Sequence, residues 1–289
     1  MAGNFWHSSH CNQWLLEKDD LVLGRQTDLI FLTEDEILKM HIFFANFIQA
    51  LAECLKQRQQ VIATSTIYFK RFYTNNSFGS IDPLLMAPTC IYLAAKVEES
   101  GLISNTRLVQ SCQSIVKTKF SYALKDFPYR MPQILECEFY LLEMMDCCLI
   151  TFNPYRSLTQ YVSDIGQEDS LLSLAWRIVN DTYRSDTCLL YPPYLIALAA
   201  LHMACVVNQK DCKQWFAELS VDMEKVLQVT QEILLFYKLW KSYDETKEIR
   251  AILAKAPKPR LSSGKMPKPS AGRSDSPASR TSIGGTTHN

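Results

Sequence analysis

The sequence is poor in glycine: the 289-residue chain has 9, and several of these lie close to its end. Phosphate-binding loops and the tight turns of β-rich folds both depend on glycine. The scarcity therefore argues against a nucleotide-binding loop and against an all-β architecture. Long stretches rich in Leu, Ala, Glu, Lys and Gln favour helix instead. The composition predicts an all-α fold.

Neither sign of charge is in excess, because 30 Lys and Arg residues offset 30 Asp and Glu residues. This balance gives no global attraction to nucleic acid or anionic lipid, and we expect no direct contact with nucleic acid. No apolar run reaches the roughly 20 residues of a membrane span, and the first residues lack the pattern of a signal peptide. We therefore expect no membrane association and a reducing compartment, in which the 10 cysteines are thiols.

Catalytic signatures are also missing. There is no Gly-x-Ser-x-Gly, Walker loop, His-Glu-x-x-His or kinase signature set, and the chain has 5 histidines. His7, His10 and Cys11 fall within one helical turn, but no fourth ligand is near, which favours a solvated helix over a metal clip. His202 and Cys205 fall in a strongly apolar segment, which favours a satisfied core histidine. We predict no catalytic residue, metal site or cofactor.

Helix start signals are frequent. Thr33 and Glu36 have the spacing of a capping box, in which each side chain binds the backbone N–H group of the other residue. A proline at the first helical position needs no partner for its nitrogen, so an Asp-Pro or Asn-Pro pair is a strong start signal. Further starts are predicted at Asp82-Pro83, Asn153-Pro154 and Ser220.

Two segments, residues 84–97 and 193–207, are apolar almost all round. A helix of this kind lies inside a bundle, surrounded by other helices. The two segments also align with each other, since PLLMA at residues 83–87 matches PYLIA at residues 193–197. A repeat of about 100 residues indicates duplicated domains, because a solenoid has a much shorter period.

After about Lys255 the composition changes to Pro, Ser, Gly, Lys and Arg. Such a segment cannot bury enough apolar surface to offset the entropy lost on ordering, so we predict a disordered tail. Its cations are separated by Pro and Ser, which favours a solvated tail over a nucleic-acid contact or a nuclear import signal.

Residues 93–99 (LAAKVEE), followed by residues 134–136 (ILE), resemble the first cyclin box, a five-helix bundle. Longer strings, such as residues 69–73 (FKRFY) and 175–184 (AWRIVNDTYR), resemble the cyclin C branch of that family. The resemblance covers about residues 1–255 and implies two tandem five-helix cyclin-box bundles. The implied segments are an amino-terminal helical extension at 1–40, a first, kinase-binding box at 41–150, a second box at 151–253 and the basic tail at 254–289.

The resemblance implies a kinase-binding surface formed by a lysine of the third helix and a glutamate of the fifth helix, here Lys96 and Glu136. Lysine only donates hydrogen bonds and a carboxylate only accepts them, so the two can satisfy both kinds of main-chain group on a kinase helix. Without the resemblance, the same residues indicate an ordinary surface ion pair. The implied neighbours in this surface are Leu93, Val97, Glu99, Tyr140 and Met145.

A second surface is implied on the second repeat, where this branch of the family has a groove for a Mediator subunit. By position its residues are Trp176, Asn180, Asp181 and Tyr237. Trp, Tyr and a paired Asp are effective interface anchors. The alternative is that Trp176 and Tyr237 only pack the second bundle.

The resemblance implies a regulatory subunit and not an enzyme. Its partners would be cyclin-dependent kinase 8 or its paralogue and the other subunits of the Mediator kinase module, acting on RNA polymerase II transcription in the nucleus. In the second repeat, Val206 replaces Lys96 and Gln231 replaces Glu136, so the first repeat alone carries the kinase surface. The alternative function is a transcription-factor-IIB-like core that binds promoter DNA, which would need a basic face.

Overall fold

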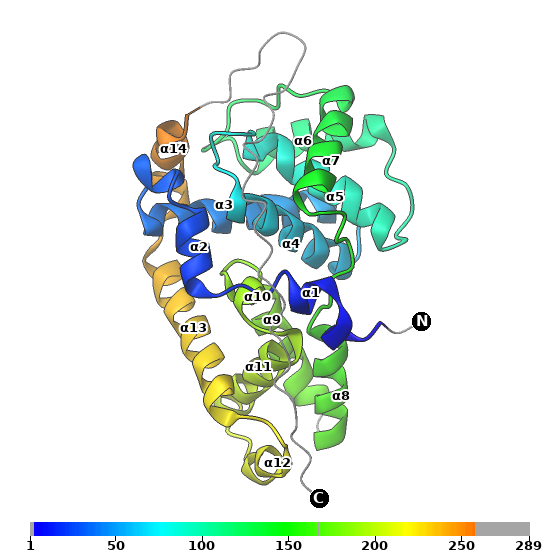
Figure 1. Ribbon diagram of the computed structural model, residues 1–289, viewed down its shortest axis with the longest axis vertical. Helices are drawn as coiled ribbons and strands as arrows, with labels where there is room; N and C mark the ends of the chain where they lie inside the picture. The colour runs from blue at the N-terminus through cyan, green and yellow to red at the C-terminus, as the bar shows by residue number, and fades with distance from the viewer. Residues whose placement is uncertain (1–2, 167, 258–289) are drawn as a thin grey trace, which may run out of the picture.

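The computed structural model describes residues 3–166 and 168–257, which form two helical bundles stacked end to end (Figure 1). Regular structure in these residues is helical throughout. The predicted tail lies outside the described residues, apart from positions 254–257. The amino-terminal extension consists of four short helical segments, which run across the junction of the two bundles. They are η1 (Phe5–His7), α1 (Ser9–Asn12), α2 (Lys18–Gly24) and η2 (Asp28–Ile30).

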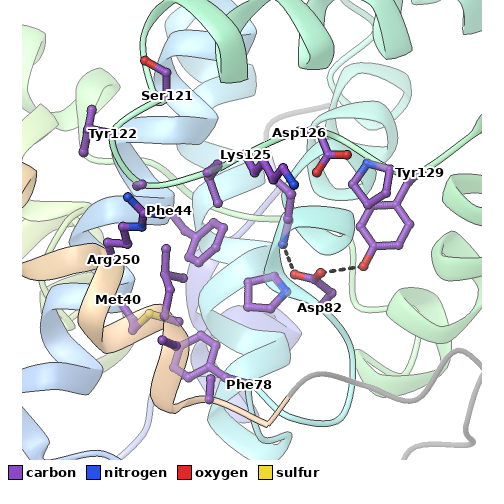
Figure 2. Close-up of a pocket in the computed structure, with 18 of the residues that line it drawn as sticks. Met40, Phe44, Phe78, Asp82, Ser121, Tyr122, Lys125, Asp126, Tyr129 and Arg250 are labelled. Atoms are coloured by element: carbon purple, nitrogen blue, oxygen red, sulfur yellow. Dashed lines mark hydrogen bonds between the residues drawn. The ribbon is translucent and has the colours of Figure 1, made fainter.

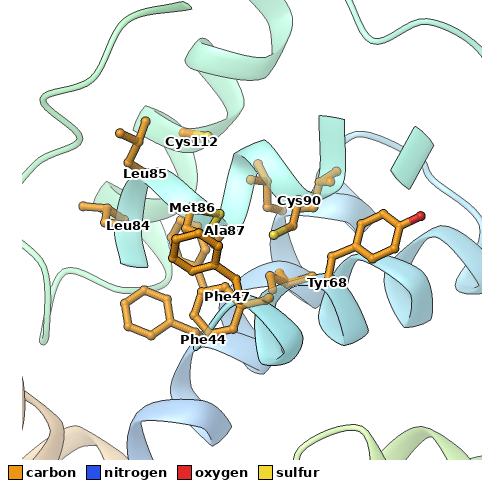
Figure 3. Close-up of a cluster of buried hydrophobic side chains, with 14 of the residues drawn as sticks. Phe44, Phe47, Tyr68, Leu84, Leu85, Met86, Ala87, Cys90 and Cys112 are labelled. Carbon is orange, nitrogen blue, oxygen red and sulfur yellow. The ribbon is translucent and has the colours of Figure 1, made fainter. Parts of the chain in front are cut away.

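The first bundle is built around α5, an apolar helix that packs against three others. Its core is rich in aromatic and aliphatic side chains, including Phe44, Phe47, Met86 and Cys90, all at most 1% exposed (Figure 3). The helices are α3 (Glu34–Cys54), α4 (Gln59–Asn75), α5 (Pro83–Val97), α6 (Asn105–Thr118) and α7 (Met131–Met144).

Two of the predicted helix starts in this bundle are confirmed. The Glu36 amide donates to Thr33 Oγ1 at 3.2 Å and the Thr33 amide donates to Glu36 Oε2 at 3.0 Å. Asp82 caps α5 by accepting from the Leu84 amide at 2.9 Å. Because α3 begins at Glu34, the first bundle begins before residue 41, where the sequence placed the boundary.

The second bundle repeats this plan around α11, which packs against α8, α9 and α13. Two starts differ slightly from the predictions: α8 begins one residue after Pro154, and Asp222 rather than Ser220 caps α13. The helices are α8 (Tyr155–Ile165), α9 (Glu168–Thr182), α10 (Thr187–Leu190), α11 (Pro193–Val207), α12 (Lys213–Glu218) and α13 (Met223–Ser242).

The last helix, α14 (Glu245–Lys255), returns to the first bundle and packs on α3. Ile249 and Ile252 belong to the first core, and Lys39 pairs with Glu248 at 2.7 Å. Figure 1 shows α13 running along one side of the molecule to bring α14 up to α3. The segment predicted as the second box therefore ends in a helix that belongs to the first core.

The duplication is visible in the two central helices. Both α5 and α11 have 15 residues, begin with proline and end in the same turn. The Ser100 amide donates to the Ala95 carbonyl at 3.0 Å, and the Lys210 amide donates to the Cys205 carbonyl at 2.9 Å. Each turn also has one residue with positive φ, at 49° for Glu99 and 52° for Gln209. This correspondence places Val206 where the first repeat has Lys96.

One helix in the described part of the chain, α3, is long and apolar enough to cross a membrane by length and composition. Its most apolar window is 67% buried inside the protein. The apolar side chains of α3, such as Phe43 and Phe47, lie in the first core. Packing inside the bundle therefore explains why this helix is apolar.

A buried group of charges joins the extension to both bundles. Arg25 donates to the two oxygens of Asp186 at 2.7 and 2.8 Å, and Lys70 Nζ lies 3.3 Å from Asp186. Arg25 belongs to the extension, Lys70 to α4 and Asp186 to the turn before α10. Burial alone would raise the pKa of Asp186, but the charges of Arg25 and Lys70 outweigh it and hold that pKa well below its usual value.

Candidate functional site

Lys96 lies in the last turn of α5 and reaches across to α7. Its Nζ donates to Glu138 Oε1 at 2.5 Å, and the same ammonium lies 4.2 Å from the centre of the Tyr92 ring. The Lys96 side chain is 35% exposed and the Glu138 side chain 11% exposed. The lysine is therefore held in one position by a carboxylate and an aromatic face while part of it stays open to a partner.

The structure pairs Lys96 with Glu138, so the predicted pairing with Glu136 is wrong. Glu136 is exposed, and a step of two residues turns the side chain about 200° around a helix. Glu138 stands four residues after buried Ile134 and three before buried Leu141. That spacing puts Glu138 on the face of α7 that meets α5, and it is the signal that identifies this residue.

The predicted neighbours of this pair divide into two groups. Leu93 is 4% exposed and Met145 is not exposed at all, so both belong to the first core and neither offers contact area as expected. Val97 and Tyr140 are half-buried, and Glu99 is exposed. The correction follows from helix geometry, because the apolar residues nearest the centre of the bundle are covered by its other helices.

Two exposed apolar side chains that are close to the pair in sequence were not predicted. Phe139, directly after Glu138, is 73% exposed, and Leu102, in the segment after α5, is 87% exposed. Large apolar side chains at such exposure are typical of surfaces that bind another protein when they gather in one place. In the sequence, Phe139 stands out because it is an apolar residue on the outer face of α7, where polar residues are expected.

The residues predicted for the groove connect α9 to α13 on one side and to α8 on the other. Tyr237 Oη donates to Asp181 Oδ2 at 3.0 Å, and Tyr155 Oη donates to Asn180 Oδ1 at 2.9 Å. The Trp176 ring lies 4.4 Å from the Tyr155 ring, centre to centre. All four predicted residues are half-buried, so they pack the second bundle and still reach the surface.

Arg184 connects the groove residues to the first bundle and was not singled out in the sequence. It donates to Asn46 Oδ1 and Gln49 Oε1 at 2.8 Å each, and to Asp181 Oδ1 at 3.2 Å. Its guanidinium also lies 4.9 Å from the Trp240 ring. Burial raises the pKa of Asp181, although the charge of Arg184 acts in the opposite direction. The groove residues therefore lie at the junction of the two bundles.

A cleft of about 740 Å³ lies between the first bundle and α14 (Figure 2). Asp82 is on its wall, where it accepts from Tyr129 Oη at 2.5 Å while it caps α5. The other charged groups of the lining are Lys125, Asp126 and Arg250. The lining contains no histidine or cysteine, so its residues cannot form a Ser–His or Cys–His pair.

No three or more His, Cys, Asp or Glu side chains in the described ranges are placed to hold a metal ion. The expected solvated helix is wrong for His10, which is 1% exposed and accepts from the Phe152 amide at 3.0 Å. His202 is half-buried, and its Nδ1 has no hydrogen-bond partner among the described residues, so it is not the satisfied core histidine expected.

The sequence matches two family models that together span most of the chain. One is the cyclin N-terminal domain, over residues 13–150, and the other is the cyclin C-terminal domain, over residues 153–252. The chain therefore belongs to the cyclin family.

Within the family the relatives point to cyclin C. The chain is 66% identical to cyclin-C of Rattus norvegicus over 261 residues, which is 90% of this chain and 92% of the relative. It is 63% identical to cyclin-C of Drosophila melanogaster over 262 residues, 90% and 98% of the two chains. Both bundles and the junction between them thus fall within the similarity to cyclin C.

Two solved structures of lower sequence identity share the fold. A chain of the yeast TFIIK complex superposes with a TM-score of 0.63 at 24% identity, covering 80% of this chain and 99% of that one. A chain of the yeast RNA polymerase II CTD kinase complex superposes with a TM-score of 0.64 at 17% identity, covering 78% and 73%. At these identities the likeness establishes the double-bundle fold.

Proposed function

We propose that this chain is the non-catalytic regulatory subunit of a cyclin-dependent kinase, which it binds through the first bundle around Lys96 and Glu138. The observation that carries the proposal is the geometry of this pair in a member of the cyclin family. Lys96 is fixed by Glu138 and Tyr92 but remains 35% exposed, at the end of the central helix. The exposed apolar residues Phe139 and Leu102 supply contact area close to the pair in sequence.

The mechanism is a shift of population in the kinase. Lys96 retains donors for main-chain carbonyls, and the second oxygen of Glu138 can accept from a main-chain amide. A surface already formed before binding loses little entropy on association and favours the one kinase conformation that fits it. In kinases the relevant element is the helix whose glutamate pairs with the active-site lysine.

The second repeat supports the assignment of this role to the first. At the position of Lys96 it has Val206, which is 64% exposed and has no charge to offer a main-chain carbonyl. The two positions are equivalent by backbone geometry, since both precede the same turn. If the charged pair only stabilised the bundle, both copies would be expected to have it. Only the first copy has it, which supports a role in binding.

The similarity to cyclin C supports a narrower proposal. The kinase is cyclin-dependent kinase 8 or its paralogue, within the Mediator kinase module, and the site of action is the nucleus, in the regulation of RNA polymerase II transcription. Trp176, Asn180, Asp181 and Tyr237 form the contact with the Mediator subunit that activates the kinase. These residues include a half-buried tryptophan and a tyrosine–aspartate hydrogen bond at the junction of the two bundles, and such groups are effective anchors for a protein partner.

The first test is the activity of purified cyclin-dependent kinase 8 with its activating Mediator subunit present. We expect the wild-type chain to activate the kinase and the Lys96→Ala/Glu138→Ala variant to lose that activation. Circular dichroism and the thermal midpoint of the variant establish that it is folded. Absence of binding and of activation by the wild-type chain would contradict the proposal, and other kinases and promoter DNA would then be tested.

A further inference from the structure

Two cysteines of the second bundle lie close together without being bonded. Cys205 is in the last turn of α11, Cys212 directly precedes α12, and their Sγ atoms are 3.3 Å apart. Both residues are buried, at 3% and 8% exposed. A disulfide bond has an S–S length of about 2 Å, so a movement of roughly 1 Å brings the two sulfurs to bonding distance.

The backbone brings the two cysteines together. After α11 the chain reverses at Gln209, which has a positive φ of 52°, and the Lys210 amide donates to the Cys205 carbonyl at 2.9 Å. The chain then returns so that Cys212 reaches the side of α11. The equivalent of Cys205 in the first repeat is Ala95, which follows from the identical turn after α5. The thiol pair is thus a property of the second repeat alone.

A small reagent can reach this pair. Cys205 and Cys212 line a pocket of about 540 Å³ that also includes Val206 and Phe216. Val206 is 64% exposed, so the pocket meets the surface beside it. Most of the other buried cysteines lie deep inside the two cores, for example Cys90 and Cys112 at 0% exposed.

We propose that Cys205 and Cys212 are a redox modification site, which hydrogen peroxide oxidises to a disulfide and a thiol reductant restores. In the first step the Cys212 thiolate attacks one oxygen of the peroxide, the O–O bond breaks, and Cys212 becomes a sulfenic acid with release of hydroxide. In the second step Cys205 Sγ attacks Cys212 Sγ, the S–O bond breaks, and water leaves with the proton of Cys205. Two thiols and one peroxide give one disulfide and two waters.

The order of the two steps follows from the hydrogen bond between the sulfurs. Cys205 Sγ is the donor and Cys212 Sγ the acceptor. Burial, followed by this hydrogen bond, raises the pKa of Cys205 to about 12, so Cys205 keeps its proton. Cys212 is also the more exposed of the two, at 8% against 3%. We therefore assign Cys212 as the thiol that meets the oxidant first and Cys205 as the resolving thiol that completes the bond.

The test is peptide mapping of the full chain after treatment with hydrogen peroxide and then with an alkylating reagent under denaturing conditions. Trypsin cleaves after Lys210 and Lys213, so the disulfide links the tripeptide 211–213 to the peptide 185–210. We expect this linked product to become the main form of Cys212 and to disappear when dithiothreitol is added before alkylation. Cys188 lies in the same large peptide, and a Cys188→Ser variant should leave the link intact.

Two variants make the test specific. Cys205→Ala copies the residue that the first repeat has at this place, and it should abolish the linked product while Cys212 is still oxidised to a sulfenic acid that a dimedone probe captures. Cys212→Ser should abolish both signals. The exposed Cys54 and Cys147 report that the oxidant was active in each sample. The proposal is overturned if Cys54 and Cys147 are oxidised while Cys205 and Cys212 remain reduced, or if Cys212 links mainly to another cysteine.

Discussion

Asp186 has more charged contacts than its place in a short turn suggests. It holds Arg25 of the extension and Lys70 of α4 in a buried group, in which the Lys70 side chain is 1% exposed. In the sequence, Asp186 is one polar residue in a turn, and no local pattern connects it to residues more than 100 positions away. Lys96, by contrast, was predicted from a short motif, and the glutamate that it contacts, Glu138, lies two positions after the predicted Glu136 on the same helix.

The Asp186→Asn variant should be strongly destabilised. It removes the carboxylate that Arg25 and Lys70 both contact. The two buried cations then have no ion-pair partner among the described residues, which costs roughly 3–5 kcal/mol. The free energy of unfolding in urea, measured at neutral pH, is the test.

Asp244→Asn is the matched control, because Asp244 pairs with Lys247 at an exposed position. It should change stability little, since exposed ion pairs contribute little. A loss of stability in Asp186→Asn no larger than that of Asp244→Asn would contradict the role given to the buried charges.

Among the helices, those with local signals were the easiest to predict. The capping box before α3 and the Asp-Pro pair before α5 act within four residues, so the sequence alone specifies them. The docking of α14 depends on pairs such as Glu36–Lys255, which are 219 positions apart, and no local pattern contains that information. The extension is similar, because its short helices are positioned by residues of the junction.

His10 of α1 makes the docking of the extension sensitive to acid. Its Nδ1 accepts from the Phe152 amide at 3.0 Å, which requires that nitrogen to be unprotonated. Burial, together with the nearby charge of Arg71, lowers the pKa of His10 from 6.5 to about 3. Since the unfolded chain takes up the proton more readily, stability is complete above pH 6.5 and falls as the pH decreases toward 3.

The expected contribution of His10 is about 1.4 kcal/mol per pH unit between roughly pH 6 and pH 4. His41 is buried with a lowered pKa and contributes in the same direction, so the two must be separated. His10→Asn keeps an acceptor for the Phe152 amide but cannot titrate. Unfolding free energies measured across this range should depend less steeply on pH in the variant, and equal slopes in the two proteins would contradict the account.

The whole molecule contains two copies of one bundle that have diverged at equivalent places. The first copy has Lys96 and Ala95 at the end of its central helix, and the second has Val206 and Cys205. The sequence predicted the duplication, the all-helical fold and the loss of charge in the second copy. It could not predict which surface residues remain exposed, as Phe139 and Leu102 do, because exposure depends on how the helices pack against each other.

The most direct test of the central claim compares two glutamates of α7 in binding to cyclin-dependent kinase 8. Glu138→Ala removes the partner of Lys96, and the account predicts a Kd raised by about tenfold or more, from the loss of a fixed charge pair at an interface. Glu136→Ala removes an exposed carboxylate from the same helix and should leave the Kd within about twofold. The opposite result, with Glu136→Ala weakening binding and Glu138→Ala neutral, would contradict the site proposed here.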